Sequence, residues 1–252
     1  MSLSSEMAMQ NMIGASQEEL TFVEAIRGPY SVASLTAMPD PVATKIVQLV
    51  LRGLEYLPKE VLGGRGQTGA HELPHYGRVF VKRYAHGGLL RSITRGRFLC
   101  VGPIRSRAEF EMLERVRAVG VNAPKPYVYV TCGSFVYSTW LIMEEIPNTK
   151  SLVELSAQDS DGLQDAMKKL SVQLLTLIKN NILHVDLHPG NVLVNEAGAV
   201  FIIDFDKARV FSGTQHQLRD LYLTRWRRAV IKHGLSPLLT ELMSLTMRSY
   251  DD

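Results

Sequence analysis

The sequence predicts an α+β protein in which a part built on an antiparallel sheet precedes a smaller helical part. Apolar runs at 127–131 and 135–146 flank a turn at 132–134, a pattern typical of two antiparallel strands. Apolar residues then recur at helical spacing over 163–181, which predicts a long helix. Two shorter apolar runs on either side of a polar turn at 195–198 predict a second hairpin.

Chemically informative residues surround this second hairpin. Asp186 and Asn191 lie in a polar loop just before its first strand, and Asp204 ends its second strand. The hairpin therefore brings all three to one end of a small sheet. Phosphoryl transfer uses such a set, with one carboxylate for the attacking hydroxyl and an amide and a carboxylate for Mg²⁺. The alternative is that Asp186 and Asn191 only form a turn and Asp204 only caps a strand.

The pattern His184-x-Asp186-x₄-Asn191, followed by Asp204-Phe205, resembles the catalytic loop and metal-binding Asp of the protein-kinase-like superfamily. This resemblance implies a two-lobed fold with a small antiparallel-sheet N-lobe and a reduced helical C-lobe. It also implies ATP and Mg²⁺ as cofactors. His184 is expected to anchor the loop by hydrogen bonds.

The chain departs from protein kinases in three ways. Asp206 stands where they have the Gly of D-F-G, His188 stands where they usually have Lys, and no A-P-E-like segment follows. All three favour a kinase of small molecules or lipids over a regulated protein kinase. His188 itself is ambiguous, since it could line the acceptor site or only cap the turn.

Composition limits the class of protein. The 252 residues are 46% apolar and 21% charged, which suits a packed core and excludes a disordered chain. Cys100 and Cys132 lack the spacing of metal ligands, which favours a reducing, cytoplasmic compartment. No apolar run reaches the roughly 18 residues that suggest a membrane span. Residues 1–10 lack the basic and apolar regions of a signal peptide.

The net charge of +3 is unevenly distributed. Residues 82–107 contain seven Lys and Arg and no acid, and residues 207–232 contain seven against the single acid Asp220. Two basic blocks in an otherwise acidic chain predict an anionic partner: phosphate groups, a membrane surface or nucleic acid. The alternative is a solvated basic face with no partner.

Residues 1–40 are weakly patterned, and we expect a loosely attached or weakly ordered extension. Within it, residues 18–26 could form a short helix that Gly28-Pro29 ends. A clearer helix begins at Asp40-Pro41, an N-cap followed by proline at the first helical position, and continues to about Tyr56. We place the N-lobe at 41–147.

Gly63, Gly64 and Gly66 form a glycine-rich run, in which backbone N–H groups can approach phosphates closely. A strand pattern then ends in Lys82. Either feature alone is weak, because loops are often rich in glycine and a lysine often ends a surface strand. Their order matches that of kinase-like proteins, so we expect the run to cover ATP phosphates and Lys82 to bind them.

Such a lysine needs a glutamate to hold it. The residues after Ser106 predict a helix, which Gly120 ends, with one apolar arc. Of its three acids, only Glu109 falls inside that arc, while Glu111 and Glu114 fall outside it. Because a buried acid requires a partner, we assign Glu109 as the ion-pair partner of Lys82.

Glu144-Glu145-Ile146 follows an apolar strand and fits the hinge between the lobes, where backbone groups would meet the adenine. The C-lobe is placed at 148–252. Its last helical region, around 218–232, is amphipathic and basic. Such a helix can lie on an anionic membrane, but we favour packing as its first role.

Three further segments narrow the resemblance. The sequence R-Y-A-H-G-G-L-L-R ends at Arg91, S-R-A-E-F begins at Ser106, and I-D-F-D-K-A-R ends at Arg209. Together with A-P-K-P at 123–126, they resemble 3-deoxy-D-manno-octulosonic acid (Kdo) kinases of lipopolysaccharide biosynthesis. The similarity runs from about Gly63 to Lys232.

This resemblance implies ATP-dependent phosphorylation of a Kdo hydroxyl on a lipid A precursor. It places the protein at the cytoplasmic face of the inner membrane of a Gram-negative bacterium. An anionic glycolipid acceptor would suit the basic blocks, the Gly-Gly turn and its arginines would contact acceptor or membrane, and no nucleic acid partner is expected.

Alternatives remain open. His188-Pro189-Gly190 is closer to the loop of soluble antibiotic or metabolite phosphotransferases, which leaves the acceptor sugar undecided. An atypical protein kinase and a catalytically silent binding module are the other two interpretations. The silent module is disfavoured because the full set of expected residues is present: Lys82, Asp186, Asn191 and Asp204.

Overall fold

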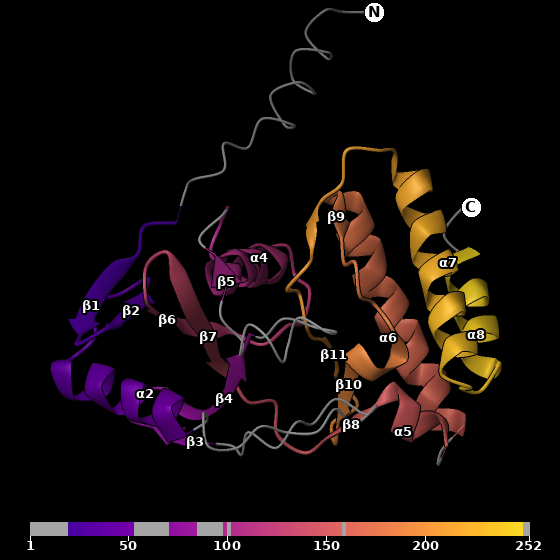
Figure 1. Ribbon diagram of the computed structural model, residues 1–252. Coiled ribbons are helices and arrows are strands. Elements are labelled where there is room, and N and C mark those ends of the chain that lie inside the picture. Colours follow the sequence, from indigo (N-terminus) through magenta and orange to yellow (C-terminus); the bar gives the residue numbers. More distant parts are fainter. Residues whose placement is uncertain (1–19, 53–70, 85–97, 100–101, 158–159, 249–252) are drawn as a thin grey trace, which may run out of the picture.

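The computed structural model describes residues 20–52, 71–84, 98–99, 102–157 and 160–248. They form a two-lobed, kinase-like α+β fold. An antiparallel sheet with a helix on either face makes one lobe, and a group of helices with two small sheets makes the other (Figure 1).

The N-lobe sheet has the strand order β1-β2-β6-β7-β4-β3, and β5 pairs with β7 outside this path. All of these pairs are antiparallel. The strands are β1 (Val23–Arg27), β2 (Tyr30–Ser34), β3 (His71–Leu73), β4 (Gly77–Arg83), β5 (Phe98–Leu99), β6 (Pro126–Cys132) and β7 (Val136–Glu144). The predicted pair of strands on either side of residues 132–134 is therefore confirmed.

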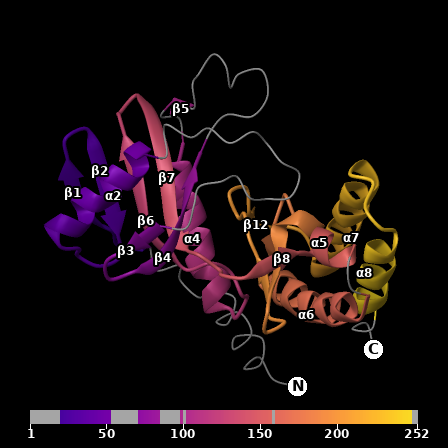
Figure 2. The ribbon, with the colours of Figure 1, turned by 90° about the horizontal axis from the view of Figure 1, so that it is seen from below.

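Helices α2 (Asp40–Arg52) and α4 (Arg105–Ala118) cover opposite faces of this sheet (Figures 1 and 2). In β2, β4, β6 and β7, alternate residues belong to different apolar clusters, as the two-residue period of a strand requires. Along β4, Val79 and Val81 pack with α2. Phe80 packs in the cluster that contains the buried residues of α4, so Lys82 shares that face.

The start of the chain is where the sequence prediction was wrong. Residues 23–27 form β1 and not part of a helix, and β2 pairs with β6, so 23–34 belong to the main sheet. Gly28-Pro29 is the two-residue turn of a hairpin, because Arg27 faces Tyr30 and Gly28 has a φ of 57°. Glycine with positive φ at the first turn position suits such a hairpin.

The C-lobe begins after the chain leaves β7. Its larger helices pack side by side at the end of the molecule away from β1 (Figures 1 and 2). The elements are β8 (Thr149–Ser151), α5 (Leu152–Ser156), α6 (Ser160–Lys179), β9 (Ile182–Leu183), the 3₁₀ turn η1 (Pro189–Asn191), β10 (Val192–Asn195), β11 (Val200–Ile202), β12 (Arg209–Val210), α7 (Gln215–Lys232) and α8 (Leu238–Arg248).

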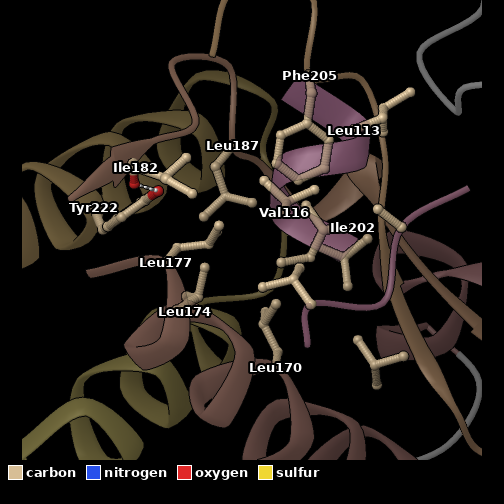
Figure 3. Packing of buried hydrophobic residues seen from close by; sticks show 14 of the residues in the cluster. Leu113, Val116, Leu170, Leu174, Leu177, Ile182, Leu187, Ile202, Phe205 and Tyr222 are labelled. Carbon is tan, nitrogen blue, oxygen red and sulfur yellow. Dashed lines mark hydrogen bonds between the residues drawn. The ribbon is translucent and has the colours of Figure 1, made fainter. Parts of the chain in front are cut away.

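The predicted long helix and second hairpin are both present. α6 carries the apolar stripe, and β10 pairs with β11 in antiparallel register, Val192 opposite Ile202. One apolar cluster runs from Leu113 and Val116 of α4 to Leu170 and other residues of α6 (Figure 3). The lobes thus share a core, which holds α4 against the base of the hairpin. Among the described helices, none is long and apolar enough to span a bilayer.

Candidate active site

The structure contains the ion pair between Lys82 and Glu109. The Lys82 ammonium donates to both carboxylate oxygens of Glu109, at 2.9 and 2.6 Å. Glu109 is 2% exposed, in the same buried arc of α4 as Phe110 and Leu113. One of the two other acids in the arc argument, Glu111, instead pairs with Arg107 one turn away, at 2.7 Å. The two-residue repeat of β4 places Lys82 on the sheet face that packs against α4, and the helical repeat of α4 places Glu109 on the side of the helix that faces this sheet.

Lys82 also reaches the second lobe. Its ammonium donates to Asp204 Oδ1 at 2.7 Å. Burial lowers the pKa of Lys82, but the carboxylates of Glu109 and Asp204 outweigh burial and leave that pKa raised. Burial likewise opposes ionisation of Asp204, yet Lys82 leaves the pKa of Asp204 lowered. The lysine is therefore a fixed positive charge between two carboxylates, one from each lobe.

Tyr84 is a member of this cluster that sequence reasoning missed. Its hydroxyl donates to Glu109 Oε2, and burial raises the pKa of the hydroxyl. The ring lies 5.1 Å from the Lys82 ammonium and 5.4 Å from the Arg105 guanidinium. The only signal for Tyr84 was its place in the R-Y-A-H-G-G segment, which carries no chemistry by itself.

The loop before η1 is held from several sides. The buried His184 ring makes a 2.9 Å contact from Nε2 to the Ile203 carbonyl, and burial lowers the pKa of this histidine. Its backbone N–H donates to the Tyr222 hydroxyl, which in turn donates to the Ile182 carbonyl (Figure 3). Arg225 of α7 donates to the Val185 carbonyl. His184 anchors the loop, as predicted.

Asp186, Asn191 and Asp204 lie at one end of the β10–β11 hairpin. Asn191 Nδ2 donates to the Asp186 carbonyl at 3.0 Å. The Ile203 N–H donates to the Asn191 carbonyl, which joins the end of η1 to the residue before Asp204. Asp204 has a φ of 66°, a left-handed conformation that Asp tolerates better than most residues. Its carboxylate accepts from the Lys82 ammonium.

Asp206, which replaces the kinase glycine, ties this segment to α4. Its carboxylate forms an ion pair with Arg105 at the start of that helix, with a 3.1 Å contact from Nε. Between the two acids, Phe205 is fully buried and packs 4.6 Å from the His184 ring. The residues 204–206 therefore contact β4, the core and α4 in succession. The sequence contained both charges of this ion pair, but nothing in it linked them.

Other predicted residues have local partners. His188 caps η1, with Nδ1 accepting from the Gly190 N–H, and its ring lies 6.3 Å from that of His233. Glu145 pairs with Arg78 at 2.7 Å. Glu144 Oε2 accepts from the backbone N–H of Lys125, the residue before β6. Ile146 follows in the segment between the lobes.

The glycine run lies outside the described residues, so its expected place over a nucleotide stays a prediction. This applies to Gly63, Gly64 and Gly66. The same holds for the Gly87-Gly88 turn and its arginines.

Comparison with known proteins agrees with this geometry. A model of the lipopolysaccharide kinase (Kdo/WaaP) family matches residues 59–237, which is most of the 252. The chain belongs to this family. The matched Kdo/WaaP region includes Lys82, Glu109, Asp186, Asn191 and Asp204.

Relatives within the Kdo/WaaP group carry the name 3-deoxy-D-manno-octulosonic acid kinase. One from Vibrio vulnificus is 31% identical over 147 residues, 57% of this chain and 61% of the relative. One from Vibrio cholerae is 29% identical over 185 residues, 70% and 78% of the two chains. One from Xylella fastidiosa is 25% identical over 187 residues, 73% and 68%. The match to the Vibrio vulnificus relative thus covers less than two thirds of its length.

Proposed function

We propose that this protein transfers the γ-phosphate of ATP to a hydroxyl of Kdo on a lipid A precursor. The observation that carries the proposal is the chain of contacts from Glu109 through Lys82 to Asp204, next to the loop that holds Asp186. Membership of a lipopolysaccharide kinase family, with relatives named Kdo kinases, supports the acceptor.

Each residue then has a role that its surroundings suit. Asp186 orients the acceptor hydroxyl and takes its proton, since its carboxylate is about half exposed and can meet a substrate. Lys82, held by Glu109, binds the α- and β-phosphates. Backbone groups at 144–146 face the adenine, and the glycine run covers the phosphates.

The residues present fit Mg²⁺. Asn191 and Asp204 are the oxygen donors that magnesium prefers, and the bond from Asn191 Nδ2 to the loop leaves its Oδ1 for a cation. No group of three or more His, Cys, Asp or Glu that could hold a metal occurs in the described ranges. This agrees with an ion held by one or two protein groups and substrate phosphates. The ion would offset negative charge on the phosphates.

The acceptor side of the proposal rests on charge. The second basic block, residues 207–232, includes the four arginines of α7. Phosphates of a glycolipid, presented at the cytoplasmic face of an inner membrane, would match this block. We propose peripheral contact with that anionic surface.

Transfer of radiolabelled γ-phosphate from ATP to Kdo-lipid A tests the function. The control is lipid A precursor without Kdo, and the matched variant is Asp186→Asn, which keeps size and removes charge. Label in the Kdo lipid alone, lost in the variant, supports sugar, reaction and base together. Label in the lipid without Kdo would contradict the acceptor.

A soluble small-molecule phosphotransferase is the second candidate. The loop His188-Pro189-Gly190 favours it, since it is similar to the loop of such enzymes. Steady transfer to free sugars or aminoglycosides, with none to Kdo-lipid A, would select this candidate. A protein kinase fits less well, because residues 207–214 alone join Asp206 to α7, too few for an activation segment.

A further inference from the structure

A lysine forms an ion pair with the carboxylate of Asp186, the proposed base. The Lys207 ammonium donates to Asp186 Oδ2 at 2.8 Å. The two residues are 21 positions apart in the chain, and Lys207 arrives from the turn after β11. Both side chains are open to solvent, with 59% of Lys207 and 43% of Asp186 exposed. A substrate that reaches Asp186 therefore also reaches Lys207.

The backbone at Lys207 is held by its neighbours. Asp206, one residue earlier, forms the ion pair with Arg105, and Phe205 is fully buried. The Ala208 N–H donates to the Phe205 carbonyl at 2.9 Å and closes a turn around Lys207. The lysine side chain thus starts from a fixed point and extends over the catalytic loop.

The loop itself contains no competing cation. From His184 to Asn191 the sequence has neither Lys nor Arg. His188, at the position where protein kinases usually carry lysine, uses Nδ1 to accept the Gly190 N–H. Because the His188 ring caps η1, the cation that contacts the Asp186 carboxylate is Lys207.

Folding stability does not account for this contact. An ion pair between side chains this exposed contributes little to the free energy of unfolding, because water screens it and both side chains lose freedom. Negative charge around Asp186 is high, however. Asp204 and Asp206 lie close enough to affect Lys207 electrostatically, and ATP and an anionic acceptor would add to them. A cation on the Asp186 carboxylate would offset that repulsion.

We propose that Lys207 is a positioning residue on the acceptor side of the site. It holds Asp186 Oδ2, so that Oδ1 faces the acceptor hydroxyl. Its positive charge also offsets the repulsion between the Asp186 carboxylate and the nearby phosphates. Lys207 thereby supplies from the turn after β11 the cation that His188 does not supply from the loop. The inference rests on the proposed phosphotransfer, and it assigns a residue that the reaction scheme above leaves unused.

The first test compares Lys207→Met with Lys207→Arg. The methionine variant keeps the side-chain length without charge, and we expect kcat to fall about 30-fold, part of the ~10²–10⁴-fold that a general base contributes. KM for ATP should change less than about twofold, because Lys82 binds the nucleotide. The arginine variant should recover most of kcat. Full activity of Lys207→Met would overturn the proposal.

Lys169→Met is the matched control. Lys169 is also a half-exposed lysine in an ion pair, with Asp165 at 2.6 Å on α6. It also donates to the Gly198 carbonyl, in the turn at the opposite end of the β10–β11 hairpin from Asp186. We expect wild-type kcat from this variant. Equal losses from both lysine variants would show a general effect of surface charge and would contradict a role specific to Lys207.

A double-mutant cycle tests the route through Asp186. In an Asp186→Asn background, Lys207→Met should lower the residual rate by less than about twofold, since its target carboxylate is gone. A further loss as large as in the wild-type background would show that Lys207 acts on the substrate directly, which contradicts positioning.

The design separates failure of this inference from failure of the proposed function. The variants are assayed with whichever acceptor the wild type phosphorylates, including water in slow ATP hydrolysis. An inactive wild type toward Kdo-lipid A refutes the proposed acceptor alone. Wild-type kcat in Lys207→Met, on any acceptor, refutes the role of Lys207 alone.

Discussion

Two lysine–carboxylate pairs hold the two sides of this site, and they differ in almost every physical respect. Lys82 and Glu109 are 22% and 2% exposed, while Lys207 and Asp186 are 59% and 43% exposed. The buried pair joins β4 to α4 inside one lobe. The exposed pair joins two loops of the other lobe and borders open solvent.

The difference in burial separates two uses of the same chemistry. Removing one partner of a buried ion pair is strongly destabilising, because it leaves an uncompensated charge away from water. An exposed pair can open and close at little cost in stability. In the proposed reaction, the first pair fixes ATP phosphates in one place, and the second yields one carboxylate oxygen to the acceptor.

The largest expected effect is from Lys82→Met. This change leaves Glu109 buried without its cation, so the free energy of unfolding should fall by about 3 kcal/mol and phosphotransfer should be lost. Urea denaturation measures the first effect and the γ-phosphate assay the second. The double variant Lys82→Met/Glu109→Leu should regain much of the stability with no activity. A stable single variant would remove the contrast between the two pairs.

Tyr84→Phe sharpens the account of the buried pair. It removes only the hydroxyl that donates to Glu109. Because hydrogen bonds to charged groups are strong, we expect a loss of about 2 kcal/mol in urea denaturation. Activity should fall less than in Lys82→Met, since Lys82 keeps its carboxylate. Phe98→Leu, which alters a nearby buried ring without removing a hydrogen bond, is the control.

The stability of the folded protein should depend on pH through both ionised groups of the Lys82–Asp204 contact. The pKa of Asp204 is lowered in the folded protein, so its contribution is present above its unfolded pKa and is lost as the pH falls through the folded value. The pKa of Lys82 is raised, so its contribution is present below its unfolded pKa and is lost only in strong alkali.

Melting temperature against pH measures this prediction. Asp204→Asn should flatten the acid side of the profile, below about pH 4, relative to wild type. Asp220→Asn, an exposed acid on α7, should leave that side unchanged. If the melting temperature of Asp204→Asn fell at acid pH as steeply as that of wild type, the assigned direction of the Asp204 pKa would be wrong.

The smallest effect is expected at Arg78, which pairs with Glu145 on the surface of the hinge side. Arg78→Ala should leave the melting temperature and kcat within error of wild type, because a surface ion pair adds little. A clear rise in KM for ATP would instead show that this pair holds the adenine side of the site, and would add a third functional ion pair to the comparison.

Local patterns predicted the parts of the site that depend on one element at a time. Glu109 could be selected because a helix repeats every 3.6 residues, and Lys82 because it follows the apolar run of a strand. Asp186, Asn191 and Asp204 could be grouped because a short hairpin necessarily joins its ends. These inferences needed no knowledge of how distant segments meet.

Predictions failed where the partner is distant in sequence. β1 and β2 were expected in a loosely attached extension, because β6, the strand that pairs β2 into the sheet, lies about 100 residues later, as Ser31 opposite Thr131 shows. A short strand at a sheet edge has weak local signals and is decided by what it pairs with. Arg105 and Asp206, also about 100 residues apart, escaped notice for the same reason.

By itself, the sequence determined the order of lobes, the loop that holds Asp186 and the buried lysine–glutamate pair, because short-range periodicity and motif spacing carry that information. Only the tertiary structure decided that Tyr84 joins Glu109, that Asp206 binds α4 and that Lys207 meets Asp186. Side chains of this kind are polar and locally unremarkable in the chain. Their partners are chosen by how the lobes pack on the shared core.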